Sequence, residues 1–184
     1  VSTKELSVEQ AMENGKLYVI CVGDAFHTEK TASRWAKIQE EFNSGVVDGK
    51  FMKEEMTECL SAFCALLSLK ISYPEFFHFL KGNHENILNV SGNGDFAFCK
   101  YADEGDMVKR FISKVYGEDI LYLISCYESL LPFAACGKYY VVTHAEPARV
   151  LTKKELIDAR KYPEVIYSII WTRFGFKKGS PPLK

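Results

Sequence analysis

Three apolar runs of the chain each end directly at a residue that can bind a metal ion or move a proton. The residues at these ends are Asp24, Asn83, His84 and His144. Carboxylate oxygen, amide oxygen and imidazole nitrogen together form a ligand set suited to manganese, iron, zinc or magnesium. An aspartate can bridge two such ions, and two ions can clamp the attacking and leaving oxygens of phosphoryl transfer. The residue types therefore indicate metal-assisted chemistry on a phosphate ester.

The imidazole of His84 adds a second kind of chemistry, because histidine can give a proton to a leaving group. A simpler interpretation is also open: Gly82 and Asn83 form an ordinary turn, and His84 is a hydrogen-bonded polar side chain. We favour a shared site, because the carboxyl ends of strands in open α/β sheets meet at ligand crevices.

The composition predicts one globular domain with a substantial core. The chain has 184 residues, 47% of them hydrophobic, and 23 basic residues nearly balance 24 acidic ones. The lack of a basic stretch argues against nucleic-acid binding. No apolar run approaches the roughly 18 residues of a membrane span, and the first residues do not form a signal peptide. Six cysteines without a Cys-x-x-Cys pair favour buried, reduced thiols in a cytoplasmic protein.

Hydrophobic periodicity predicts an α/β fold in which short strands deliver these residues. Helices are expected over residues 5–14, 28–42, 52–69, 107–116, 119–131 and from a capping box at Thr152 and Glu155 to 161. Strands are expected at 17–22, 76–80, 133–136 and 139–143, with the run at 17–22 buried, and 165–171 is a last apolar run. The Gly137-Lys138 pair favours a type II′ hairpin turn.

Several motifs together resemble the phosphoprotein phosphatase branch of the calcineurin-like metallophosphoesterases. The Gly82-Asn83-His84-Glu85 sequence carries the resemblance, and Tyr73-Pro74-Glu75-Phe76-Phe77 before it is similar to the family's Tyr-Pro-Glu-Asn-Phe stretch. Leu131-Pro132-Phe133-Ala134-Ala135 is similar to a Leu-Pro-Ile-Ala-Ala segment that leads to a metal-binding histidine. Ile170-Trp171 falls where the family has Leu-Trp-Ser-Asp, so the resemblance covers about residues 17–174.

The resemblance implies a sandwich of two mixed β-sheets flanked by helices, and two metal ions. The ions would be manganese, iron, zinc or magnesium, with manganese favoured. Asp24 would bridge them, Asn83 and His144 would bind the second ion, and Glu85 would hold the surrounding loop. A metal-bound hydroxide would attack phosphorus while His84 protonates the leaving oxygen. The substrate would be a phosphoprotein or a small phosphate ester.

The chain also departs from the family. The opening Gly-Asp-x-His-Gly motif and the last metal-binding histidine are absent, so residues 1–184 are expected to form a single but incomplete domain. His27 and Thr28 stand where the family has an Asp and an Arg, and Trp171-Thr172-Arg173 lacks its aspartate. The glycines expected after His144 are replaced by Ala145-Glu146-Pro147.

Four residues are candidates to replace what is lost. His27 is either a surrogate ligand or orienting group, or an ordinary histidine of a diverged loop. Arg34, Arg149 and Lys81 are candidate phosphate-binding residues, although the two arginines are more readily interpreted as surface ion-pair residues.

The sequence leaves three functional hypotheses. The first is a metal-dependent phosphoesterase similar to serine/threonine protein phosphatases. The second is a degenerate phosphatase domain that binds a partner, and the third is a dinucleoside polyphosphate hydrolase on the same fold.

Overall fold

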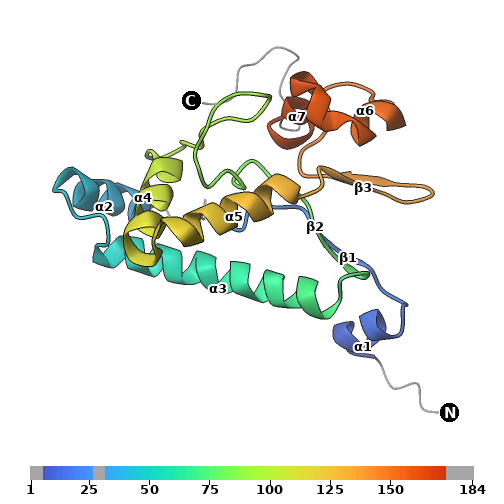
Figure 1. Ribbon diagram of the computed structural model, residues 1–184, viewed down its shortest axis with the longest axis horizontal. Coiled ribbons are helices and arrows are strands. Elements are labelled where there is room, and N and C mark those ends of the chain that lie inside the picture. Colours follow the sequence, from blue (N-terminus) through green and yellow to red (C-terminus); the bar gives the residue numbers. More distant parts are fainter. Residues whose placement is uncertain (1–5, 27–31, 173–184) are drawn as a thin grey trace.

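The computed structural model describes residues 6–26 and 32–172, and helices make up most of it (Figure 1). The helices are α1 (Val8–Glu13), α2 (Ala32–Asn43), α3 (Lys50–Ser72), α4 (Glu104–Tyr116), α5 (Glu118–Leu130), α6 (Lys153–Ile157), the 3₁₀ helix η1 (Ala159–Lys161) and α7 (Pro163–Ile170). The strands are β1 (Val19–Cys21), β2 (Phe77–Phe79), β3 (Ala134–Cys136) and β4 (Val141–Thr143). The predicted mixed α/β class is confirmed.

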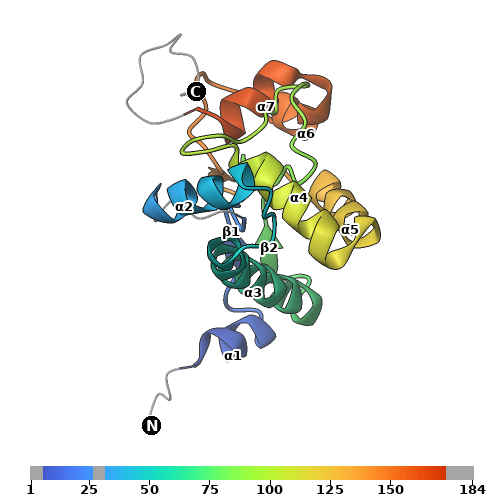
Figure 2. The same cartoon turned by 90° about the vertical axis from the view of Figure 1, so that its left-hand side faces the viewer.

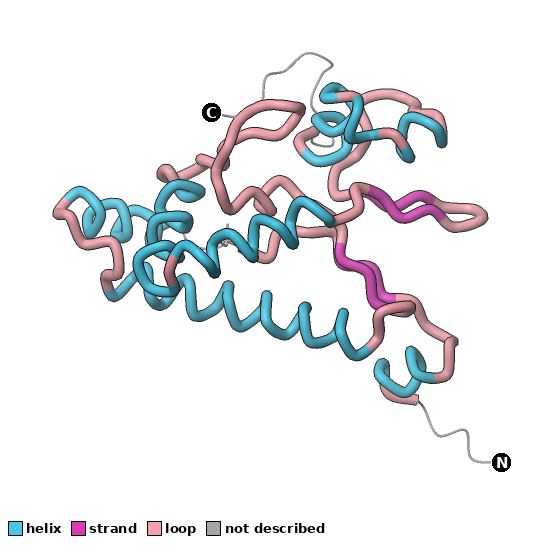
Figure 3. The backbone as a smooth tube through the Cα atoms, viewed as in Figure 1, coloured by secondary structure: helices cyan, strands magenta, loops and turns pink. Residues whose placement is uncertain are grey.

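The strands form two separate pairs, which stand out from the helices in Figure 3. β1 lies parallel to β2, with Val19 opposite Phe77, and β3 lies antiparallel to β4, with Ala134 opposite Thr143. Within the part of the chain that is described, neither pair has a third strand. The prediction that the run at 17–22 is buried is therefore wrong: β1 has one neighbour, and Tyr18 is 58% exposed.

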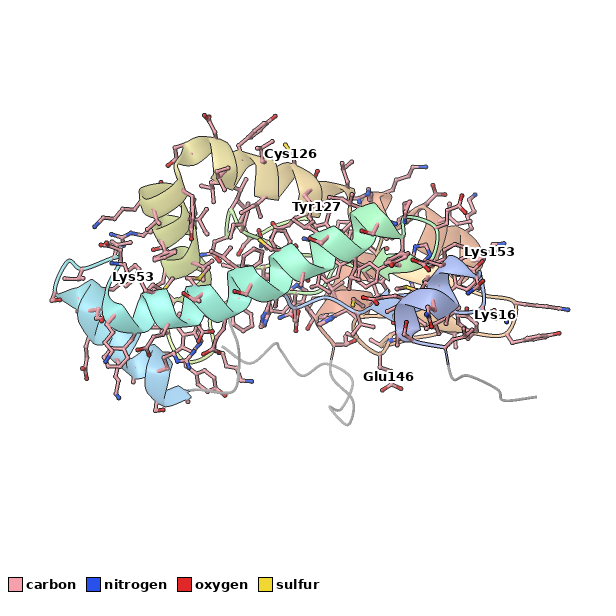
Figure 4. All side chains as sticks on the ribbon, turned by 90° about the horizontal axis from the view of Figure 1, so that it is seen from below. Lys16, Lys53, Cys126, Tyr127, Glu146 and Lys153 are labelled. Atoms are coloured by element: carbon pink, nitrogen blue, oxygen red, sulfur yellow. The ribbon has the colours of Figure 1, made fainter. Side chains whose placement is uncertain are left out.

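The main core lies between helices α2, α3, α4 and α5. In α3 the buried apolar residues recur at intervals of three or four, which places them on one face of the helix. They are Met52, Met56, Cys59 and Phe63. Tyr127 of α5 completes the contact with α3: its ring lies 5.6 Å from that of Phe63, and Figure 4 shows it on the inner side of α5 with Cys126 further out. The amphipathic stripe of α3 thus decides which helices cover it.

Two smaller clusters support the strands. Met12, Phe77, Phe79 and Leu131 pack around the parallel pair. A third cluster on α7 and η1 includes Phe133, the residue before β3. The apolar run at 165–171 is therefore mostly helical, because Pro163 in the first turn suits a helix start and its stripe faces this cluster. Figure 2 shows α6 and α7 together at one end of the molecule and α1 at the other.

The β3–β4 turn differs from the prediction. The N–H of Gly137 donates to the Tyr140 carbonyl at 2.9 Å, which moves the tip of the hairpin to Lys138 and Tyr139. Gly137 does not adopt a positive φ. A Cβ at Gly137 would instead lie 2.4 Å from the ring of Tyr140, so the glycine makes room for an aromatic side chain.

All six cysteines are free, as predicted, but they are not uniformly buried. Cys59 is buried, whereas Cys64, Cys99 and Cys136 are exposed. Cys64 follows the buried Phe63 directly, so it points away from the inward stripe of α3. Among the described helices, none is long and apolar enough to cross a membrane.

Candidate functional site

The segments that leave β1 and β2 touch each other at two glycines. Gly23 has a φ of 100°, and a Cβ there would lie 2.5 Å from the backbone nitrogen of Gly82. A Cβ at Gly82 would in turn lie 2.5 Å from Oδ1 of Asp24. Asp24 itself has a φ of 67°, which is uncommon for a residue with a side chain. The close approach of two backbones therefore explains why glycine precedes both Asp24 and Asn83.

Glu85 fastens these two segments together. Its carboxylate is fully buried and accepts three backbone N–H bonds: Asp24 at 2.9 Å, Ala25 at 2.8 Å and Gly82 at 2.7 Å. Burial first, and the negative charge of Asp24 second, raise the pKa of Glu85, and the three N–H bonds oppose that rise. The carboxylate therefore ties the segment that follows β1 to the segment that follows β2.

His144 meets Asp24 and Asn83 at one point. Its Nε2 lies 2.9 Å from Oδ1 of Asn83 and 3.5 Å from Oδ1 of Asp24. Its Nδ1 donates to the Val22 carbonyl at 2.6 Å, because a carbonyl can only accept. In the neutral imidazole, Nε2 then carries a lone pair and faces two oxygens. The structure thus brings three electron-pair donors together at the ends of β1, β2 and β4.

This arrangement fits part of a metal site. With ligand bonds of about 2.1 Å, neighbouring ligand atoms stand roughly 3.0–3.4 Å apart. The 2.9 and 3.5 Å separations around Nε2 of His144 lie just below and just above that range. No group of three or more His, Cys, Asp or Glu side chains that could hold a metal ion occurs in residues 6–26 and 32–172. The fit therefore depends on the amide of Asn83, and the set is a partial one.

His84 lies beside this point but is enclosed. It is 3% exposed, and its ring centroid lies 3.8 Å from that of Phe98. Its Nδ1 lies 2.8 Å from the Phe26 carbonyl, and its Nε2 lies 3.9 Å from Oδ2 of Asp24. The backbone N–H of His84 also donates to Oδ1 of Asp24 at 3.4 Å. The two carboxylate oxygens of Asp24 thus face one imidazole ring each, Oδ1 that of His144 and Oδ2 that of His84.

The predicted phosphate-binding residues are engaged elsewhere. Arg34 is ion-paired to Glu55 at 2.9 Å and to Glu58 at 2.8 Å, both on α3. Arg149 is paired to Glu155 at 2.7 Å. For both arginines, this agrees with the alternative interpretation as ion-pair residues.

Lys81 is closest in sequence to the site and is also held. Its Nζ donates to the Glu85 carbonyl and lies 3.2 Å from Oδ2 of Asp95. The other oxygen of that carboxylate, Oδ1, accepts from the indole N–H of Trp171 at 3.0 Å. Lys81 therefore links the segment that follows β2 to the end of α7. His27, the remaining candidate, lies outside the described residues.

Three groups that the sequence did not single out shape this region. Two are the main-chain carbonyls of Val22 and Phe26, for which a sequence carries no signal. The third is Glu128 of α5, which is 4% exposed and accepts the N–H of Ile87 at 2.7 Å. Its position four residues after Ile124 and three before Leu131 placed it on the apolar stripe, which is a usable signal for a buried carboxyl.

The comparisons with known proteins give no relative: no family model, curated protein or solved structure matches the chain.

Proposed function

We propose that this chain is a metal-dependent phosphoric ester hydrolase similar to the phosphoprotein phosphatases. The observation that carries the proposal is the position of Nε2 of His144. It lies 2.9 Å from Oδ1 of Asn83 and 3.5 Å from Oδ1 of Asp24. These are the residues to which the motif resemblance gives metal-binding roles. The corresponding sandwich of two mixed sheets belongs to the proposal as well, and the described residues form only a parallel β1–β2 pair and an antiparallel β3–β4 pair.

Asp24, Asn83 and His144 would hold the ion, with manganese favoured. When bound, such an ion polarises phosphoryl oxygens and makes water a better nucleophile. The chain's own residues do the rest. Val22 orients His144, and Glu85 fixes Asp24 through its backbone N–H. His84 carries a proton on Nε2 for the leaving oxygen of a phosphoprotein or small phosphate ester. A cytoplasmic setting is part of the proposal, because free cysteines persist where thiols are kept reduced.

Metal content and turnover of matched variants test the proposal. The purified chain with added manganese should bind metal, measured by plasma emission, and Asp24→Asn should lose it. Asp48→Asn is the control, because Asp48 is a surface carboxylate paired to Lys53 and Lys114. Since only Asp24, Asn83 and His144 provide ligands in the described part, we expect at most one weakly bound ion per chain.

The role of His84 needs a substrate with a poor leaving group, because a good one needs little protonation. We expect His84→Asn to keep its metal and to lower turnover of an alkyl phosphate roughly 100-fold or more. His78→Asn, on β2, is the control and should change neither the metal content nor the turnover. An unchanged rate for His84→Asn would show that His84 is not the proton donor to the leaving oxygen.

A second candidate function is a degenerate phosphatase domain that binds a partner. It is favoured by the pairing of both Arg34 and Arg149 with glutamates, which leaves these arginines committed away from phosphate. Absence of both metal and turnover would favour this candidate. Preferential cleavage of a dinucleoside polyphosphate over phosphomonoesters would instead indicate the third hypothesis on the same fold.

A further inference from the structure

The segment at 22–26 binds both histidines of the site through its main chain. The carbonyl of Val22, two residues before Asp24, accepts from Nδ1 of His144 at 2.6 Å. The carbonyl of Phe26, two residues after Asp24, lies 2.8 Å from Nδ1 of His84. Each imidazole then presents Nε2 to one oxygen of the Asp24 carboxylate, at 3.5 Å for His144 and 3.9 Å for His84. One short segment thus sets the orientation of two rings from distant parts of the chain.

The Phe26 carbonyl is held in place by its own side chain. The ring of Phe26 is 1% exposed and belongs to the core of α2, α3, α4 and α5. It lies 4.9 Å from the ring of Phe63 on α3. In addition, the N–H of Ala25 donates to Glu85 at 2.8 Å, which fixes the Asp24–Ala25 peptide just before Phe26. The position of the carbonyl is therefore determined by the helical core and by the β2 exit together.

We propose that Phe26 is a positioning residue for His84, acting through its main-chain carbonyl where the diverged motif lacks an aspartate. A carbonyl can only accept, so the hydrogen on Nδ1 of His84 stays there in every protonation state. Nε2 is then the nitrogen that exchanges a proton. When its N–H bond breaks and an O–H bond forms on the leaving oxygen, the electron pair stays on Nε2 and the ring keeps its Nδ1–H. The catalytic role of His84 rests on the proposed function. The tautomer of His84 does not, because it follows from the contact with the Phe26 carbonyl.

The tautomer can be measured without any activity. Long-range ¹H–¹⁵N correlation spectra of histidine-labelled chain report which nitrogen of each neutral ring carries hydrogen. The chain has only four histidines, so single His→Gln variants assign every signal. We expect His84 and His144 in the Nδ1–H form. A neutral His84 in the Nε2–H form would overturn the proposal, whether or not the chain is a phosphatase.

A matched pair of variants separates positioning from packing. Phe26→Ala and Met56→Ala both truncate a buried side chain of the same core. Phe26→Ala should shift His84 toward a mixture of tautomers and lower kcat for an alkyl phosphate roughly 10- to 100-fold, with little change in KM. Met56→Ala should leave the His84 tautomer unchanged. Equal effects of the two variants would reduce Phe26 to a packing residue.

Two further outcomes are informative. If Phe26→Ala does not fold, Phe26→Leu removes the ring that packs against Phe63 but keeps an apolar side chain, and its His84 signals are compared with those of the unchanged chain. An altered tautomer supports the proposal, and an unaltered one contradicts it. If the unchanged chain shows the Nδ1–H form of His84 but no turnover, the positioning role stands and the proposed hydrolase function fails.

Discussion

The two halves of the candidate site rest on strands of very different exposure. At the β2 exit, Asn83, His84 and Glu85 are 8%, 3% and 0% exposed. On the β3–β4 hairpin that delivers His144, Val141 is 56% exposed and Tyr139 at the tip is 86% exposed. His144 is held by its bond to the Val22 carbonyl, and the next residue, Ala145, donates its N–H to the Ile169 carbonyl at 2.8 Å. One half is thus fixed by the core and the other by a few hydrogen bonds.

This difference separates stability from site geometry. Changes on the β1–β2 side should affect both the free energy of unfolding and the site, because the same buried groups serve both. Changes on the exposed hairpin should leave stability almost unaffected. Three experiments test this contrast, in order of decreasing expected effect.

The largest effect should come from the pH dependence of the buried half. Burial foremost raises the pKa of Glu128 from 4.5 to about 8, and its Oε1 has no hydrogen-bond partner among residues 6–26 and 32–172. Between these pH values the folded chain keeps a proton that the unfolded chain releases. The contribution is therefore present below pH 4.5 and lost as pH rises to about 8. We expect the free energy of unfolding to fall by roughly 1.4 kcal/mol per pH unit in that window.

The control for this prediction is Glu128→Gln, which keeps an acceptor for Ile87 but cannot ionise. Urea unfolding at several pH values should show a markedly flatter profile for this variant. An equal slope in both proteins would show that Glu128 is not the group responsible.

The second largest effect should come from the close contact between the segments that follow β1 and β2. A methyl group at Gly82 would lie 2.5 Å from Oδ1 of Asp24 and 2.9 Å from Nδ1 of His144. We expect Gly82→Ala to lower stability by roughly 1–3 kcal/mol and to abolish metal binding. Gly45→Ala is the control, because Gly45 has a φ of 85° but open space around it. It should cost about 1 kcal/mol from backbone strain and retain the metal. Equal metal content in the two variants would show that metal binding does not depend on the close contact at Gly82.

The smallest effect should come from the hairpin. Tyr139→Ser removes an exposed ring, so we expect the free energy of unfolding to change by no more than about 0.5 kcal/mol, with unchanged metal content. Phe77→Ala, in the buried strand β2, should cost about 3–5 kcal/mol. Thermal and urea unfolding of both variants measure the contrast. A destabilisation of similar size at Tyr139 would mean that the hairpin face is covered in solution.

The sequence by itself determined several local elements and led to the hypothesis of a shared site. The three- and four-residue spacing of Met52, Met56, Cys59 and Phe63 determines the inner face of α3, and the capping box at Thr152 and Glu155 begins α6. Both depend on near neighbours, so the letters suffice. The ligand-type residues at the ends of three apolar runs also pointed to a shared site, because strands of one sheet system end at common edges.

Only the tertiary structure decided which groups serve that site. The bonds of Glu85 to Asp24 and of His144 to Val22 join residues 61 and 122 positions apart. The Val22 and Phe26 carbonyls carry no sequence signal, because every residue has one. The pairing of Arg34 and Arg149 with glutamates depends on which helices lie side by side. Local periodicity determines whether a segment forms a helix or a strand. Hydrogen-bond partners between elements depend on how those elements pack together in the core.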